Sequence, residues 1–156
     1  MIIHLETFIA ASPEIVFDLS LNIDLHKIST AHTGEEAIAG KTSGKIGLNE
    51  TVTWRARHLF KWRTMTSKII ELEPYTYFTD KMVAGDFKSF VHHHYFEPHN
   101  GGTLMRDVVV FESPYGLPGK LVDIIFMKSY LQKLLGDRNR VIREYATTGD
   151  WKKLAG

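Results

Sequence analysis

The sequence has no cysteine, no excess of either charge and no long apolar run. The lack of cysteine excludes disulfide scaffolds, thiol nucleophiles and zinc–thiolate sites together. Lys plus Arg is 19 and Asp plus Glu is 18, so the net charge of +1 produces no long-range field that would attract a polyanion. Nucleic acid is therefore not an expected partner.

The first residues, MIIHLETFIAAS, lack the features of a targeting or anchoring segment. They contain no basic region, and His4 and Glu6 interrupt the apolar residues. They therefore match neither a secretion signal nor a membrane span. A cytoplasmic location is expected by default.

Apolar and aromatic residues are plentiful. The chain is 44% hydrophobic and 12% aromatic over 156 residues, which is enough for a substantial core. No repeat, low-complexity tract or linker divides it. We therefore expect a single ligand-binding domain, residues 1–156, with one cavity or site.

The longest patterned stretch runs from Pro118 to Thr147 and predicts one helix of about 45 Å. Its apolar stripe is wider than a surface helix needs, so we expect cover on more than one side. The stripe comprises Leu121, Ile124, Ile125, Leu131, Leu135, Ile142 and Tyr145, with Phe126, Met127, Tyr130, Leu134 and Val141 beside it. Gly136-Asp137 interrupts the helix, and a kink or a close neighbour is expected there.

The residues before this helix predict a strand, two short helices and six more strands. Alternation from Ile3 to Ile9 is typical of a strand, and Ser12-Pro13-Glu14 is typical of a helix start. The short helices are expected at roughly 14–21 and 24–30, and the later strands at roughly 35–40, 48–58, 60–72, 75–84, 87–97 and 103–113. Short connections favour antiparallel pairing of neighbours. The predicted class is α+β, with a curved seven-stranded antiparallel sheet around a long C-terminal helix.

This element order is that of the helix-grip fold, and a set of short motifs makes the similarity more specific. The motifs are Ser12-Pro13-Glu14-Ile15-Val16-Phe17, Phe78-x-Asp80, Gly85-x-Phe87, Phe90-x-His92-x-His94-x-Phe96, Thr103-x-x-x-Asp107 and Pro114-x-Gly116. From Ile2 to about Ala146 the chain resembles the START-like, or Bet v 1-like (SRPBCC), superfamily of polyketide cyclases and lipid-transfer proteins. Within it, the chain is most similar to a bacterial ligand-binding group also found fused to epimerase-like proteins. Met82, Asp86 and Phe90 stand where glutamine, proline and tryptophan are common in that group, which bears on the ligand more than on the fold.

An inward face that carries polar residues is predicted for the hairpin around Pro98–Gly102. Residue numbers of facing partners sum to about 199 in the expected register, so His94 faces Met105 and His92 faces Asp107. One face then has the larger apolar load and is expected to point inward. It holds Phe90, His92, His94, Phe96, Met105, Asp107, Val109 and Phe111, and the same period adds Phe78, Asp80 and Met82 of the preceding strand.

Inward-facing His92, His94 and Asp107 need partners, because an unmatched buried polar group costs about 1–3 kcal/mol. The favoured interpretation is a structural His92–Asp107 pair or a polar pocket wall. A functional version has the histidines and Asp80 orienting one end of an apolar ligand. A His-x-His metal site and acid–base catalysis by His92 with Asp107 are less favoured alternatives. A Ser-His-Asp hydrolase is disfavoured, because the chain has no G-x-S-x-G motif.

The residues and the resemblance together predict a non-enzymatic carrier or sensor of a small, largely apolar molecule, held between the sheet and the C-terminal helix. The expected ligand site comprises Phe78, Asp80, Met82, Phe90, His92, His94, Phe96, Met105, Asp107, Phe111, Ile124, Tyr130 and Leu131. No catalytic residue, metal or cofactor is assigned, and a homodimer is left open. Two alternatives are a cyclase- or dehydratase-like enzyme that uses the same cavity and a co-chaperone-like interaction module that uses the outer sheet. A pocket of roughly a few hundred Å³ would favour the binder or the enzyme over the module, whose interior would be filled.

Overall fold

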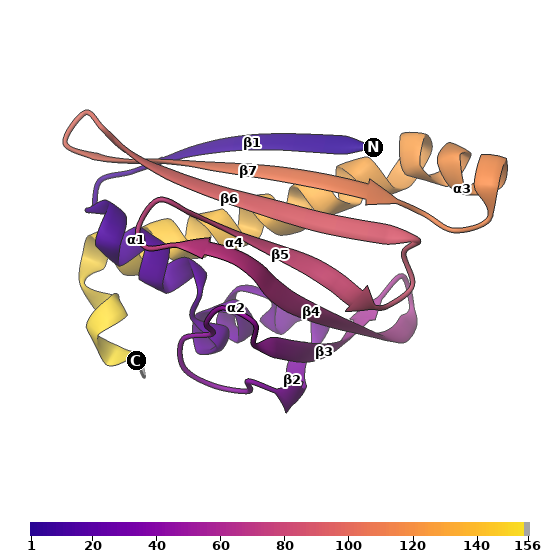
Figure 1. Cartoon of the computed structure of the whole chain (residues 1–156), viewed down its shortest axis with the longest axis horizontal. Coiled ribbons are helices and arrows are strands. Elements are labelled where there is room, and N and C mark those ends of the chain that lie inside the picture. The colour runs from indigo at the N-terminus through magenta and orange to yellow at the C-terminus, as the bar shows by residue number, and fades with distance from the viewer. Residues whose placement is uncertain (155–156) are drawn as a thin grey trace.

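The computed structural model describes residues 1–154, in which a curved antiparallel sheet wraps around a long C-terminal helix (Figure 1). In chain order the elements are β1 (Ile2–Ile9), α1 (Pro13–Ser20), α2 (Ile23–Ser29), η1 (Ala31–Thr33), β2 (Glu36–Gly40), β3 (Thr51–His58), β4 (Lys61–Glu73), β5 (Tyr77–Ala84), β6 (Ser89–His99), β7 (Gly102–Glu112), α3 (Gly116–Val122), η2 (Asp123–Met127), α4 (Lys128–Thr148) and η3 (Asp150–Lys153). The seven strands lie in the order β1-β7-β6-β5-β4-β3-β2. The expected α+β helix-grip architecture is confirmed.

The two short helices begin where the sequence places their caps. Ser12 Oγ accepts from the Ile15 backbone N–H at 3.5 Å, and Pro13 occupies the first turn of α1. Asn22 Oδ1 accepts from the Leu25 N–H at 3.0 Å and begins α2. α1 packs against β6, β7 and α4, so it closes one end of the inner face of the sheet.

The β6–β7 hairpin has the predicted faces but a register that differs by two residues. His94 faces Asp107 and His92 faces Val109, because the strands continue to His99 and Gly102 and leave only Asn100 and Gly101 in the turn. Both turn residues have positive φ, 46° and 77°, as a two-residue hairpin turn requires. The expected register, with His92 opposite Asp107, is therefore wrong. A shift of two keeps every side chain on its predicted face.

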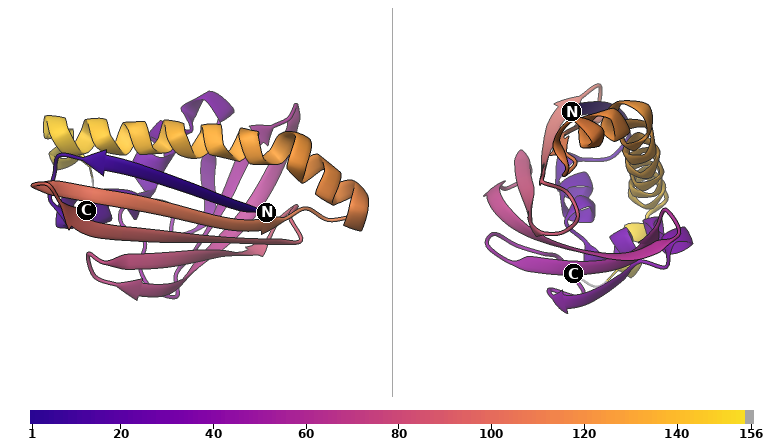
Figure 2. Two further views of the ribbon diagram at one scale, coloured as in Figure 1. Left: turned by 90° about the horizontal axis from the view of Figure 1, so that it is seen from above. Right: turned by 90° about the vertical axis from the view of Figure 1, so that its right-hand side faces the viewer.

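The C-terminal helix is continuous from α3 through α4, but η2 is a π-helical segment (Figures 1 and 2). The helix bends between α3 and α4 (Figure 2), whereas α4 runs without interruption through Gly136, where a kink or a close neighbour was expected and an added Cβ would meet no atom within 4 Å. Asp123, at the start of η2, is buried and accepts hydrogen bonds from the Ser113 N–H and hydroxyl, which ties the helix to the end of β7. No helix within residues 1–154 is long and apolar enough to cross a bilayer.

The core fills one end of the space between sheet and helix. Beneath α1, the ring of Phe17 makes edge contacts with Phe78 and Phe96, at centroid distances of 5.7 and 5.3 Å. Trp151 packs against this cluster, so the tail folds back onto the chain. A smaller cluster of Ile3, Val109 and Phe111 lies against the middle of the helix.

The helix glycines give a direct stability test. We expect Gly136→Ala to stabilise the fold by about 0.5–1 kcal/mol, because an added Cβ meets no atom within 4 Å and alanine loses less backbone entropy on folding. The melting temperature should rise by about 1–4 °C. The matched variant Gly119→Ala should instead destabilise, because its Cβ would lie 2.0 Å from the Pro114 carbonyl oxygen. A lowered melting temperature for Gly136→Ala would mean that the helix is distorted at that glycine.

Candidate functional site

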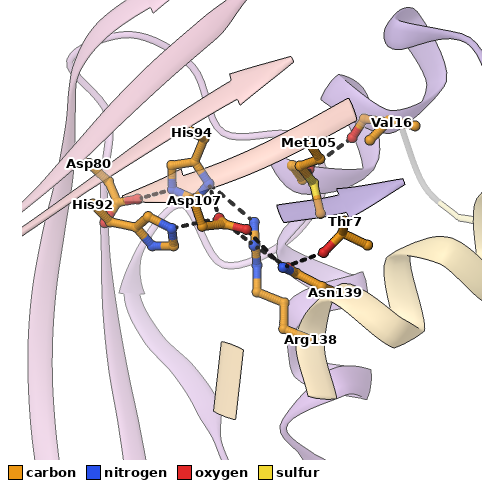
Figure 3. Close-up of polar contacts among 10 residues, drawn as sticks. Thr7, Val16, Asp80, His92, His94, Met105, Asp107, Arg138 and Asn139 are labelled. Atoms are coloured by element: carbon orange, nitrogen blue, oxygen red, sulfur yellow. Dashed lines mark hydrogen bonds and ion pairs between the residues drawn. The ribbon is translucent and has the colours of Figure 1, made fainter. Parts of the chain in front are cut away.

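Two histidines of β6 point inward because alternate strand residues share a face. His92 and His94 are buried, and their rings stack with centroids 3.6 Å apart. Across the ladders, Asp80 of β5 faces His92, and Asp107 of β7 faces His94. The sheet therefore places two carboxylates beside two imidazoles (Figure 3).

Asp107 is the centre of a buried network that joins the sheet to the helix (Figure 3). Its Oδ1 accepts from His92 Nε2 at 2.7 Å, and its Oδ2 accepts from Asn139 Nδ2 at 2.8 Å. Arg138 Nη1 lies 3.4 Å from Oδ1, and Asn139 also donates to Thr7 Oγ1 at 3.2 Å. Burial alone would raise the pKa of Asp107, but the His92 hydrogen bond and the nearby positive charge outweigh it and hold this pKa below its usual value. The carboxylate is ionised and matched by donors.

His94 forms a second pair with Asp80, at 2.7 Å between Nε2 and Oδ2. Burial, together with the adjacent His92 ring, lowers the pKa of His94 to about 3, so the ring is neutral near pH 7. For Asp80, burial would raise the pKa, but the His94 hydrogen bond and the surrounding charges outweigh it and the pKa falls. A neutral His94 donates from Nε2 to Asp80 and accepts at Nδ1 from Arg138 Nη2, 3.4 Å away.

His92 keeps one ring nitrogen without a protein partner. In a neutral ring, donation from Nε2 to Asp107 leaves Nδ1 as an acceptor. Within residues 1–154 Nδ1 makes no hydrogen bond. Every fully buried side-chain nitrogen or oxygen in that range does make one, so Nδ1 is not fully buried. Nδ1 is therefore open to the cavity that His92 lines.

This cavity has a volume of about 660 Å³ and lies between the inner face of the sheet, α2 and the C-terminal helix. Asp80, His92, His94 and Arg138 form one polar end of it. The walls are mainly apolar and include Ile23, Val52, Trp54, Ile69, Phe90, Met127, Leu131, Leu134 and Leu135. A volume of this size lies within the range of about 300–1,000 Å³ typical of small-molecule sites.

The structure brings together only part of the residue set expected at the ligand site. Seven line the cavity: Phe78, Asp80, Phe90, His92, His94, Tyr130 and Leu131. Phe96 and Met105 instead belong to the core beneath α1, and Phe111 to the core near β1. Asp107 stands behind the histidines and acts on the cavity through them and through Arg138, which it also contacts.

Two expected positions are corrected. Met82 lies outside the lining, and its sulfur packs beside Gly85. Ile124 is 65% exposed and points away from the cavity, because the π-helical segment adds one residue to a turn and rotates the preceding apolar stripe by about 100°. Asp123 takes the buried position that the regular period assigned to Ile124. The expected cover on several sides of the helix is accordingly wrong for α3 and η2, where Leu117, Leu121 and Ile125 are also exposed.

The sequence interpretation missed the two helix residues of the network, Arg138 and Asn139. Arg138 lies seven residues after Leu131 and four before Ile142, so it falls on the apolar face of the helix. A charged residue in such a stripe is the signal that could have identified it. Its buried guanidinium meets the carboxylate that the sheet holds inside.

A second polar group, His26 with Glu35, also lines the cavity. His26 Nε2 lies 2.7 Å from Glu35 Oε1, and the His26 ring packs on Trp54 with centroids 4.3 Å apart. His26 comes from α2, Glu35 from the loop before β2, and Trp54 from β3. No local motif in the sequence links them. They add polar groups to a lining that is mainly apolar.

The cavity opens to solvent between the β3–β4 turn and α3. Leu59, Tyr115 and Val122 line it and are 36%, 86% and 49% exposed. On this side the His58 Nδ1 and the Tyr130 hydroxyl, 2.6 Å apart, join β3 to α4. Burial lowers the pKa of His58 and raises that of Tyr130, so the hydroxyl keeps its proton and donates to the ring.

This arrangement supports two kinds of chemistry. The free His92 Nδ1, the Asp80 carboxylate and the Arg138 guanidinium can hold the polar end of a bound molecule. The same His92, oriented by Asp107, has the hydrogen bonding that a general base needs. A filled interior, as an interaction module would have, does not fit a cavity of about 660 Å³.

The Arg138–Asp107 contact gives the second prediction. We expect Arg138→Met to destabilise the fold by about 3 kcal/mol, because it leaves a buried carboxylate without its counter-charge. Chemical denaturation measures this. The control Arg140→Met, which removes an exposed guanidinium 3.9 Å from Asp137, should change stability by less than about 0.5 kcal/mol. Equal effects of the two variants would show that the buried contact contributes nothing specific.

Comparison with known proteins places this geometry in a known fold. No protein-family model matches the sequence, and no curated protein has a similar sequence. Solved structures do match: the protein TTHA0849 from Thermus thermophilus has a TM-score of 0.71 at 19% identity, covering 91% of this chain and 97% of that one. Ara h 8.0201 has a TM-score of 0.70 at 16% identity, covering 95% and 98%, and major latex-like protein 151 from Panax ginseng reaches 0.69 at 15%, covering 94% and 97%. The chain therefore shares the fold of these solved structures, a curved antiparallel sheet around a long C-terminal helix.

Proposed function

We propose that this protein is a non-enzymatic carrier or sensor that holds a small, largely apolar molecule in the cavity between sheet and helix. The observation that carries the proposal is a cavity of about 660 Å³ with apolar walls and a polar inner end. Apolar burial at about 25 cal/mol per Å² supplies the affinity, and the polar end sets the orientation.

The charges at the polar end favour a neutral head group. Asp80 and Asp107 contribute two carboxylates, and Arg138 contributes one guanidinium already in contact with Asp107. An anionic head would meet a surplus of negative charge, whereas a hydroxyl could donate to His92 Nδ1. The ligand class that fits best is a long-chain or ring alcohol, with its hydroxyl at His92 and its apolar part along Leu131 and Leu134.

Filling the cavity should remove binding without unfolding the protein. We expect Leu134→Trp to weaken the binding of a neutral naphthylamine fluorescent probe at least about tenfold, because the indole occupies the space that the probe needs. The control Lys133→Trp adds the same indole at the adjacent helix position, which is 76% exposed. Fluorescence titration measures both variants, with melting temperatures alongside. Absence of saturable probe binding to the unmodified protein, or equal binding by Leu134→Trp, would contradict the carrier proposal.

The polar anchor has its own test. We expect His92→Ala to weaken the binding of dodecanol about five- to tenfold, the effect of losing one hydrogen bond, without weakening that of dodecane. Displacement of the fluorescent probe measures both affinities. The control His93→Ala changes the neighbouring imidazole, whose Nδ1 faces Thr79 Oγ1 at 3.0 Å, and should alter neither affinity. An unchanged dodecanol affinity in His92→Ala, together with a lower melting temperature, would assign His92 to structure alone.

A further inference from the structure

We propose that Asp80, His92 and His94 form a binding site for a divalent transition-metal ion, Zn²⁺ or an ion of similar ligand preference, at the polar end of the cavity. The proposal goes beyond apolar ligand binding, and its test is independent of the probe measurements. Two imidazoles and a carboxylate are a ligand set that suits Zn²⁺, Co²⁺ and Fe²⁺.

The three side chains are already close enough to share an ion. One ligand atom from each lies within 4.8 Å of the other two. Ligand atoms around a tetrahedral Zn²⁺ lie about 3.4 Å apart, so modest rotations would complete the site. Asp80, with its side chain 20% exposed, has room to make such a movement, whereas the histidines are packed.

Each imidazole has a nitrogen that can face the ion. His92 is 6% exposed, and its Nδ1 has no protein partner within residues 1–154 while opening onto the cavity. His94 Nε2 lies 2.7 Å from Asp80, and an ion bound there would require the ring to carry its proton on Nδ1 instead, the nitrogen that lies 3.4 Å from Arg138 Nη2 in the metal-free protein.

Asp107 is positioned to support both histidines from behind. A metal-bound histidine usually donates its other N–H to a carboxylate, which fixes the ring. Asp107 Oδ1 lies 2.7 Å from His92 Nε2 and 3.5 Å from His94 Nδ1, the nitrogens that would carry the protons when the ion binds His92 Nδ1 and His94 Nε2. One carboxylate thus serves both rings, and Asn139 holds its second oxygen at 2.8 Å (Figure 3).

The cavity supplies what a purely structural site lacks, an open coordination position. Three protein ligands leave a fourth place for water or a ligand oxygen, and this place faces the apolar space. A divalent ion would also reverse the local charge surplus of Asp80 and Asp107 over Arg138. The metal-bound form should therefore accept anionic oxygen groups, such as a carboxylate or an enolate, that the metal-free form disfavours.

Cobalt titration tests the site directly. Protein dialysed against a chelator is titrated with Co²⁺, and the visible absorption of low-symmetry Co²⁺ is followed before competition with Zn²⁺. We expect one equivalent to bind, Zn²⁺ to displace it, and Asp107→Asn to weaken binding about 10–100-fold. Asp80→Asn, which keeps the side-chain size, and His94→Ala should abolish it, with melting temperatures recorded for each.

The control variant lies inside the same His92-His93-His94 run. His93→Ala removes the imidazole on the opposite face and should leave Co²⁺ binding unchanged. No one-equivalent binding, or a loss in His93→Ala as large as in His94→Ala, would overturn the metal site. Binding of the neutral probe to metal-free protein, measured in parallel, shows separately whether the carrier function holds.

Discussion

A carboxylate in the interior of the sheet, Asp107, constrains the rest of the molecule. An unpaired buried charge costs several kcal/mol, so its oxygens must be matched wherever the fold places them. Their partners come from β6, through His92, and from α4, through Arg138 and Asn139. Asn139 continues the network to Thr7 on β1. The strand register and the rotation of the helix about its axis must therefore agree at this point, which fixes the helix over the sheet.

The cavity lies toward the start of the C-terminal helix, where several apolar side chains of the helix point outward and not toward the sheet. Beneath α1, Phe17, Phe78 and Phe96 fill the space between the layers. Toward the other end, the π-helical segment Asp123–Met127 turns Ile124 and Ile125 outward, while Met127 packs against the sheet cluster of Ile3, Val109 and Phe111. The same extra residue buries Asp123, whose carboxylate holds the helix start to Ser113. The π-helical segment thus buries the carboxylate of Asp123 in place of apolar side chains, and the interior beside it stays open.

The sequence predicted the element order and the faces of the strands, because both depend on local periods and turn residues. The inward positions of His92, His94 and Asp107 were predicted correctly even though the register was wrong by two, since strand faces repeat every two residues. The error arose because Pro98 was assigned to the turn. Pro98 lies beyond the last β5 pair, Tyr77–Tyr95, where β6 has a strand neighbour on one side only and a proline is tolerated. Ile124 was misplaced because a π-helical turn has no sequence period of its own, and the wall of His26, Glu35 and Trp54 depends on tertiary contacts alone.

The Asp107 carboxylate and the His92 Nδ1 atom, both at the inner end of the cavity, differ in whether they need a hydrogen-bond partner from the ligand. Asp107 is satisfied by protein donors and stays so whether the cavity is empty or occupied. His92 Nδ1 is open to the cavity, where water can reach it. The free energy of ligand binding depends on which group of the ligand lies beside this nitrogen. An apolar group there removes the water and offers no donor, which costs about 1–3 kcal/mol. The walls therefore favour any apolar molecule of suitable size, and the one open acceptor selects against those that bring no donor to the inner end.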